Sequence, residues 1–391
     1  MELEILPARH GDCMLLHFGS KSEPRLALID GGPAGVYHET LIPRLDEIRE
    51  ERGLSETDPL VIDLLMISHI DDDHVNGIVR LLKDMQQRAE DGKPPRFRIR
   101  RMWHNSFDDI IGNKESETAL QLSDQYGTAS AGEGDIPQEE GMPFRDWQVL
   151  ASVAQGHAIR KLAEALKIPV NPDFGGGLIK TGKGAEVTID DLTFTVLGPR
   201  QDELAELEDT YDKWLKKTKR GRASGEALLA CFSDESVANL SSLVMLVRSK
   251  KESILLTGDA RGDYILKAIE ELGLGDTKGR LKVDVLKVPH HGSDRNVTQG
   301  FFESIPARRY VLSGDGGHGN PERPCLEWIA AARGRRHVTL HIPYSLERID
   351  RRREELHKGS AWSDETHSLG RLVEGFPKGV TVKAGSEDRI A

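Results

Sequence analysis

The chain has 391 residues, of which 38% are hydrophobic, and a formal net charge of −11 at pH 7. This length holds one large domain or two small ones, and the excess of negative charge argues against a protein that coats DNA. No apolar run approaches the ~18 residues of a membrane-spanning helix, and the first residues lack a basic signal segment. The three cysteines, at positions 13, 231 and 325, are far apart in the sequence. We therefore expect a cytoplasmic α/β protein without membrane contact.

The first hundred residues predict strands and two helices. Strands are expected at 3–7, 13–18 and 25–29 as an antiparallel meander, because short apolar runs alternate with glycine-rich turns. A charged amphipathic helix is predicted at 37–52. A buried strand follows at 60–66, and a second helix is expected from Gly77 to about Ala89. Residues 96–105 alternate as a strand does, and their arginines form either a solvated face or a contact to phosphate.

Four side chains of metal-ligand type lie between the strand at 60–66 and the helix that begins at Gly77. They are His69, Asp71, Asp73 and His74. Two imidazoles and two carboxylates suit a divalent ion such as zinc or manganese, and their spacing lets two ions share one short loop. An ordinary solvated turn has no reason to be so dense in these residue types.

The middle of the chain is more polar. We interpret residues 106–182 as an insertion over the active-site face, with a helix at 147–166 and a role in selecting the substrate. A strand at 192–199 starts the second half, and a charged helix is expected at 201–225. The densest basic run, 213–222, includes Lys216, Lys217, Lys219 and Arg220 next to one tryptophan. It forms either a nucleic-acid contact or a solvated loop.

Two strands of the second half also end in ligand-type residues. The segments 239–247 and 253–260 predict a hairpin that ends at Asp259, and the apolar run 283–288 is followed by His290, His291 and Ser293. We expect one of the two histidines to bind metal, with His290 preferred, and the other to face the substrate. A helix at 322–334 and strands at 337–342 and 380–382 complete the chain.

The pattern H-x-D-x-D-H at 69–74 resembles the metallo-β-lactamase signature H-x-H-x-D-H, with Asp71 in place of the middle histidine. That variant resembles the hydrolase domain of the ComEC/Rec2 competence proteins and their stand-alone relatives. Four further segments are similar to motifs of this family in the same order. They are the turn at 10–12, with His10 in place of glutamine, Asp30-Gly31-Gly32, L-L-T-G-D at 255–259, and L-K-x-x-H-H-G-S at 286–293. The closing segment S-x-G…G-H-P is matched loosely, since two residues separate His318 from Pro321.

The resemblance implies a four-layer αββα sandwich, formed by one domain over 1–391 with the insertion 106–182 and a C-terminal extension at 330–391. It also implies two divalent ions, zinc or manganese, held by six ligands. These are His69, Asp71, Asp73, His74, Asp259 and His290. Asp30 would support the metal loop by hydrogen bonds. Where the wider superfamily has a third-motif histidine, this chain offers Asn239 and Ser241, so we expect the first ion to be weakly held.

The resemblance further implies a phosphodiesterase or nuclease that cleaves DNA through an activated water. Asp73 would orient this water or take its proton, and His291 and His318 would stabilise charge or protonate the leaving group. Ser293 would contact phosphate, whereas His318 could instead only stabilise its loop. Two alternatives remain open: a hydrolase of small phosphodiesters such as phosphorylcholine esters, and an adaptor that binds a protein partner through the insertion. The sequence leaves the oligomeric state unknown.

Overall fold

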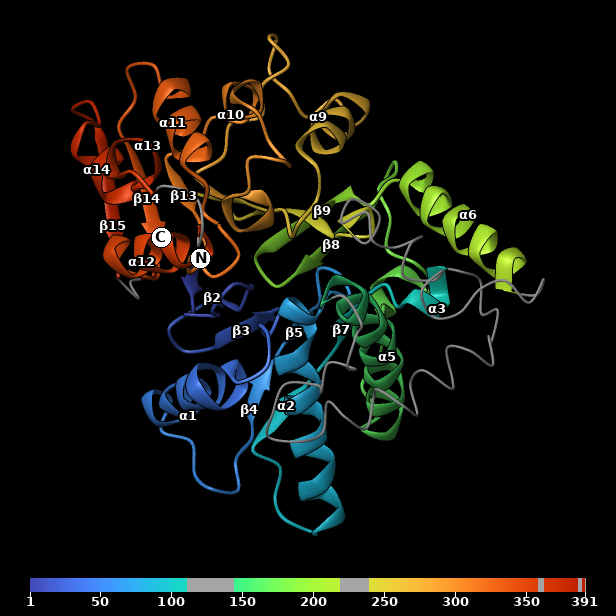
Figure 1. The fold of residues 1–391 in the computed structure, drawn as a ribbon. Coiled ribbons are helices and arrows are strands. Elements are labelled where there is room, and N and C mark those ends of the chain that lie inside the picture. The colour runs from blue at the N-terminus through green and yellow to red at the C-terminus, as the bar shows by residue number, and fades with distance from the viewer. Residues whose placement is uncertain (111–143, 219–238, 358–361, 386–388, 391) are drawn as a thin grey trace. The chain divides into compact units, whose positions relative to one another are not determined.

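The structure is a computed structural model that describes residues 1–110, 144–218, 239–357, 362–385 and 389–390 (Figure 1). The chain divides into two compact units. Unit 1 comprises residues 1–24, 180–198 and 244–391, and unit 2 comprises residues 25–179 and 199–243. Each unit contains strands and helices, so the expected mixed α/β class is confirmed. Within the described residues no helix is long and apolar enough to cross a membrane.

Unit 1 is built on a sheet whose described strands follow the order β15-β14-β13-β12-β11-β10-β9-β8. Their bounds are Glu186–Ile189 (β8), Leu192–Gly198 (β9), Val244–Arg248 (β10), Ser253–Leu256 (β11), Val285–Lys287 (β12), Arg309–Val311 (β13), Val338–Ile342 (β14) and Val380–Ala384 (β15). Strands β8 to β11 pair antiparallel, and β11 to β15 pair parallel. The expected hairpin at 239–260 is therefore confirmed. Unit 1 also holds the antiparallel pair β1 (Glu2–Ile5) and β2 (Met14–Gly19).

Helices connect the parallel strands of unit 1, as a parallel pair requires. They are α9 (Gly262–Glu271), α10 (Gln299–Ser304), α11 (Arg323–Ala332), α12 (Leu346–Leu356), α13 (Asp364–His367) and α14 (Leu369–Glu374), with the short η4 (Pro289–Gly292) after β12. Helix α10 lies between α9 and α11 (Figure 1). Side chains of these three helices, including Ile265, Phe302 and Leu326, join strand residues in one buried core.

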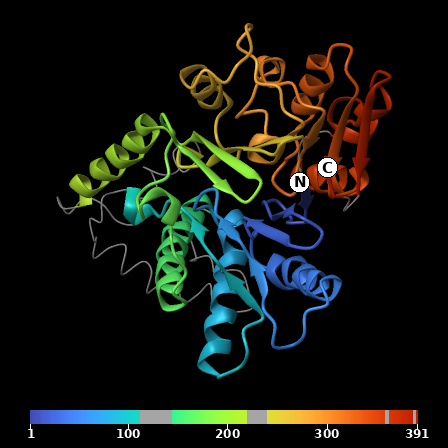
Figure 2. The ribbon, with the colours of Figure 1, turned by 180° about the vertical axis from the view of Figure 1, so that it is seen from behind.

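Unit 2 contains three parallel strands, β3 (Pro24–Ile29), β5 (Leu64–Met66) and β7 (Met102–Trp103), and a separate parallel pair, β4 (Leu60–Ile62) and β6 (Phe97–Ile99). Its helices are η1 (Tyr37–Leu41), α1 (Ile42–Glu51), α2 (Asp72–Glu90), α3 (Phe107–Ile110), α5 (Phe144–Ala165), η3 (Pro172–Phe174) and α6 (Gln201–Thr218). Helices α2 and α5 pack side by side, as both ribbon views show (Figure 2).

Two local expectations differ from the structure. The apolar run 60–66 is two strands, because the buried Asp63 between them accepts the Leu26 N–H at 3.2 Å and a guanidinium N–H from Arg25 at 2.9 Å. Helix α2 begins at Asp72 rather than at Gly77, so Asp73 and His74 lie in its first turn. Carboxylates are favourable there because the N-terminal end of a helix carries partial positive charge.

The segment 330–391, expected as an extension, supplies β14 and β15 to the sheet of unit 1, where both pair in parallel. Part of the insertion 106–182, residues 111–143, lies outside the described residues. In the described part, α5 forms the long helix expected at 147–166, and residue 170 forms a bridge with Met102 at the end of the parallel strands of unit 2.

Candidate functional site

In unit 2, three of the predicted ligands lie together. One ligand atom from each of His69, Asp73 and His74 falls within 4.8 Å of the others, and the two imidazole centroids are 4.0 Å apart. Asp71 is the residue before α2, and its Oδ2 lies 3.5 Å from His69 Nε2. The loop predicted from the sequence therefore brings all four side chains near one another.

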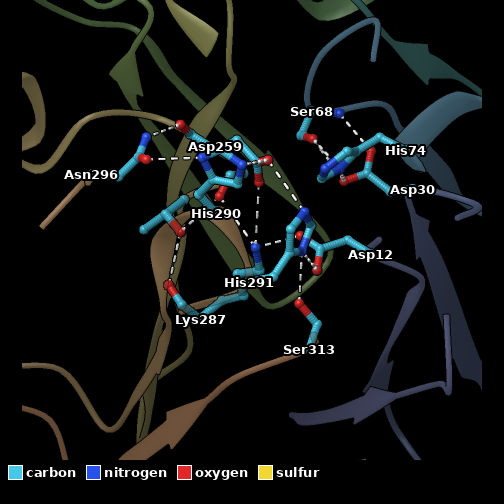
Figure 3. A network of polar contacts seen from close by, with 12 residues as sticks. Asp12, Asp30, Ser68, His74, Asp259, Lys287, His290, His291, Asn296 and Ser313 are labelled. Atoms are coloured by element: carbon cyan, nitrogen blue, oxygen red, sulfur yellow. Dashed lines mark hydrogen bonds and ion pairs between the residues drawn. The ribbon is translucent and has the colours of Figure 1, made fainter. Parts of the chain in front are cut away.

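Two groups contact the Nδ1 side of the His74 ring. Its Nδ1 lies 2.9 Å from Asp30 Oδ2 and 3.2 Å from the Ser68 hydroxyl (Figure 3). The carboxylate of Asp30 also accepts the Ser68 backbone N–H and hydroxyl, both at 2.7 Å. This arrangement fixes the imidazole ring and leaves Nε2 as the nitrogen that could hold a metal ion. It gives Asp30 the supporting position that the resemblance implied.

Gly31 and Gly77 set the backbone of this loop. The Gly31 N–H donates to the His74 carbonyl at 2.7 Å, and the Gly77 N–H donates to the Gly32 carbonyl at 3.0 Å. A Cβ on Gly77 would stand 2.0 Å from the Gly31 oxygen, far inside any real contact. The end of β3 and the start of α2 can approach this closely because neither glycine has a side chain.

The segment expected near the third metal motif also belongs to unit 2. Asn239 and Ser241 are both buried, and the Leu243 N–H donates to the Ser68 carbonyl at 2.7 Å. A side-chain amide and a hydroxyl are not among the usual ligands of zinc. The prediction of a weakly held first ion therefore stays a prediction.

In unit 1, three acidic and imidazole groups lie together: Asp12, Asp259 and His291. One ligand atom of each falls within 4.8 Å of the others. His291 Nδ1 is 3.1 Å from Asp12 Oδ1 and 2.9 Å from the Ser313 hydroxyl, and His291 Nε2 is 3.3 Å from Asp259 Oδ2 (Figure 3). All three are at least 98% buried. Burial lowers the pKa of His291, but the carboxylates of Asp259 and Asp12 raise it by more, so that this pKa lies well above its usual value.

The paired histidines occupy a strained turn. His290 and His291 have φ values of 50° and 55°, in the left-handed region that residues with a Cβ rarely adopt. They therefore lie in a turn and not in an extended strand. His290 Nδ1 lies 2.8 Å from Asn296 Oδ1, and its Nε2 is 3.8 Å from Asp259. His291 is the more deeply buried of the two and lies closer to Asp259, and the expectation that His290 is the ligand stays a prediction.

Two further predicted residues have structural partners. The Ser293 hydroxyl donates to Glu322 Oε2 at 3.1 Å, and its contact to a phosphate stays a prediction. The ring of His318 stacks on His10, with centroids 4.1 Å apart. The loop of His318 is held by Arg353, whose Nε donates to the Gly319 carbonyl at 3.1 Å. His10, which replaces a glutamine of the resembled motif, is thus the neighbour of His318.

The basic residues divide into two sets. Arg96, Arg100 and Arg101 pair with Asp46, Asp63 and Asp173 respectively, which favours a structural role for the segment 96–105. This segment holds the two short strands β6 and β7 instead of the single strand expected. Lys216 and Lys217 belong to the last turn of α6. Lys219 and Arg220 lie outside the described residues.

Sequence reasoning missed three contributors to the group in unit 1. Asp12 was assigned only to a turn motif, and Ser313 and Lys287 were assigned no role. Lys287 has a signal in the sequence, since a lysine within the apolar run 283–288 has to place its ammonium inside the protein. Its Nζ contacts Asp12 Oδ2 and lies 3.7 Å from Asp259 Oδ1.

No family model and no curated protein matches the chain. Among solved structures it is similar to the MIM-2 metallo-β-lactamase, with 14% identity over 72% of each chain and a TM-score of 0.29. The Rm3 metallo-β-lactamase has 13% identity, covering 82% of this chain and 85% of that one, with a TM-score of 0.28. A metallo-β-lactamase mutant from Cronobacter sakazakii has 14% identity, covering 63% of this chain and 55% of that one, with a TM-score of 0.25. The site is therefore interpreted from its own residues.

Proposed function

We propose that the chain is a metal-dependent hydrolase. The observation that carries this proposal is that each unit presents a histidine beside an aspartate, with the Nδ1 of that histidine held by a second aspartate and a serine. Imidazole nitrogen with carboxylate oxygen is a donor set that fits zinc or manganese. His69, Asp71, Asp73 and His74 would hold a divalent ion in unit 2, and Asp259 and His291 would hold one in unit 1.

A divalent ion bound to such residues lowers the pKa of a coordinated water and stabilises negative charge on the reacting group. The residues of the chain supply the rest. Asp30 and Asp12 hold His74 and His291 in one tautomer, with the proton on Nδ1. Asp73, whose side chain is 18% exposed, is the carboxylate placed to accept a proton. His318, on a loop fixed by Arg353, is the candidate donor to a leaving group.

Within this class we propose a phosphodiesterase or nuclease that acts on DNA. The proposal is supported by the resemblance of 69–74, 255–259 and 286–293 to the ComEC/Rec2 hydrolase motifs and by the basic run 213–222. The net charge of −11 favours a second candidate, a hydrolase of small phosphodiesters, because a long polyanion is repelled more strongly than a small ester. An adaptor that acts through the insertion would need no metal chemistry.

One experiment separates these functions. Protein loaded with zinc or with manganese is incubated with single-stranded DNA, duplex DNA, RNA and a chromogenic phosphodiester at several salt concentrations. Cleavage of nucleic acid should weaken steeply as salt rises, whereas hydrolysis of the small ester should change little. A nuclease should lose this slope when Lys216, Lys217, Lys219 and Arg220 are neutralised together. Absence of hydrolysis on all four substrates would contradict the phosphodiesterase proposal.

A further inference from the structure

Lys287 places its ammonium among Asp12, Asp259 and His291 of unit 1. The residue is 0% exposed. Its Nζ contacts Asp12 Oδ2, donates to the Gly258 carbonyl at 3.2 Å, and lies 3.7 Å from Asp259 Oδ1 (Figure 3). Burying a charge is costly unless a partner of opposite charge is close. The nearest carboxylate to Lys287 is therefore its ion-pair partner, and that carboxylate is Asp12.

The two carboxylates of this group are oriented in the same way. Asp12 turns Oδ2 to Lys287 and Oδ1 to His291 Nδ1, at 3.1 Å. Asp259 turns Oδ1 to Lys287 and Oδ2 to His291 Nε2, at 3.3 Å. The two carboxylates thus lie at opposite nitrogens of one imidazole, and Asp12, at the Nδ1 side, is the one that the Lys287 ammonium contacts more closely.

We propose that Lys287 and Asp12 form a permanent ion pair that orients His291 for metal binding, so that Asp12 is a positioning residue and not a metal ligand. A divalent cation at Asp12 would stand beside the Lys287 ammonium, and like charges at such distances repel strongly in a buried site. Asp12 instead accepts the Nδ1 proton of His291, which leaves Nε2 and Asp259 to bind the ion. This inference rests on the proposed metal dependence and holds for any substrate.

The first test measures zinc binding by the full chain, without substrate. In Asp12→Asn the number of zinc ions bound at saturation should equal that of the wild type, while the affinity falls about 10–100-fold, the usual effect of changing a residue that supports a ligand. If Asp12 is itself a ligand, the variant should bind fewer ions at saturation, as Asp259→Ala should. That result would overturn the proposal.

The second test measures thermal unfolding after chelation. Lys287→Met should lower the melting temperature by several degrees, because it leaves Asp12 buried without its cation. The double variant Lys287→Met/Asp12→Asn, in which the pair is replaced by neutral groups, should melt above Lys287→Met. Lys282→Met is the matched control, since Lys282 is exposed in the same unit, and it should leave the melting temperature unchanged. A double variant that melts no higher than Lys287→Met would contradict the ion pair.

The third test reads the imidazole directly. In ¹⁵N-histidine spectra of the zinc-loaded protein, His291, assigned through His291→Gln, should carry its proton on Nδ1 and zinc on Nε2. The Nδ1 proton should resonate at lower frequency in Asp12→Asn, because a neutral amide oxygen accepts a weaker hydrogen bond than a carboxylate. A purely structural role for Asp12 would leave this resonance in place, and zinc on Nδ1 would exclude the proposed orientation. These measurements do not depend on whether the protein cleaves DNA.

Discussion

The groups proposed to bind metal in the two units, around His74 and His291, support their histidine in the same way. In unit 2 the Nδ1 of His74 is held by Asp30 and Ser68, and in unit 1 the Nδ1 of His291 is held by Asp12 and Ser313. The supporting carboxylates differ in how their own charge is balanced. Asp30 accepts hydrogen bonds from neutral donors, whereas Asp12 contacts the ammonium of Lys287. The same histidine orientation is thus reached in two electrostatic environments, and the difference should appear in stability rather than in geometry.

The largest effect is expected from removing a carboxylate ligand in either unit. Asp73→Ala and Asp259→Ala should each lose bound zinc and at least ~10²–10³ in turnover, because both the ion and a charge-stabilising group are lost. Elemental analysis and single-turnover rates check this expectation. The exposed Asp91 and Asp263 serve as controls in units 2 and 1, and their alanine variants should retain metal. Unchanged zinc in both ligand variants would refute the assignment.

The next largest effect is expected from replacing Asp30 or Asp12, the two aspartates that contact a histidine Nδ1. Asp30→Asn and Asp12→Asn should both weaken zinc binding by about 10–100-fold, since both carboxylates orient a histidine. The two variants should differ in their free energy of unfolding once a chelator has removed the metal. Asp12→Asn leaves a buried ammonium without its partner and should cost ~3 kcal/mol or more, whereas Asp30→Asn removes bonds to neutral donors and should cost about 1–3 kcal/mol. Urea unfolding measures both, and equal losses would mean that the balance of charge is unimportant.

A smaller effect tests the backbone contact found in unit 2. Gly77→Ala should destabilise the protein by about 1–3 kcal/mol and weaken metal binding, because its Cβ would displace the Gly31 carbonyl. Gly156→Ala is the control on the neighbouring helix α5. There a Cβ meets Ile70 at 3.6 Å, an ordinary contact, and replacing a helical glycine should stabilise the protein by roughly 0.5–1 kcal/mol. Equal stability of the two variants would show that the loop relaxes freely.

The smallest effect concerns the turn after the paired histidines of unit 1. Burial, together with the nearby Glu322, raises the pKa of Asp294 from 3.8 to about 6. A carboxyl whose pKa is raised by folding binds its proton more tightly in the folded state, so its contribution to stability falls as pH rises from about 4 to 6. Asp294→Asn should therefore raise the melting temperature more at pH 7 than at pH 4. A melting curve series at both values checks this, and a larger gain at the lower pH would reverse the assignment.

The sequence predicts where in the chain the site residues lie better than it predicts which of them contact one another. Strands followed by ligand-type residues could be recognised because apolar runs stop shortly before His69, Asp259 and His290, and the structure has strand ends three positions before each of them. The first turn of α2 was assigned to a loop, because four polar residues at a helix N-terminus have no apolar period. Asp63 breaks the run 60–66 through contacts with residues distant in sequence, which no local pattern contains. The placement of Lys287 and the choice between His290 and His291 likewise depend on tertiary contacts.

The left-handed backbone at His290 and His291 affects how the protein responds to mild heating. A non-glycine residue in this conformation costs about 1–2 kcal/mol, so the turn persists only while its surroundings hold it. Its anchors include the His290 N–H bond to the Gly258 carbonyl and the Asn296 amide bond to the Asp259 carbonyl. When these hydrogen bonds open, the backbone of the turn can relax to a conformation of lower free energy. The core strands beside it carry no such strain to release. We therefore expect the capacity to bind metal to fade during mild heating before the fold melts.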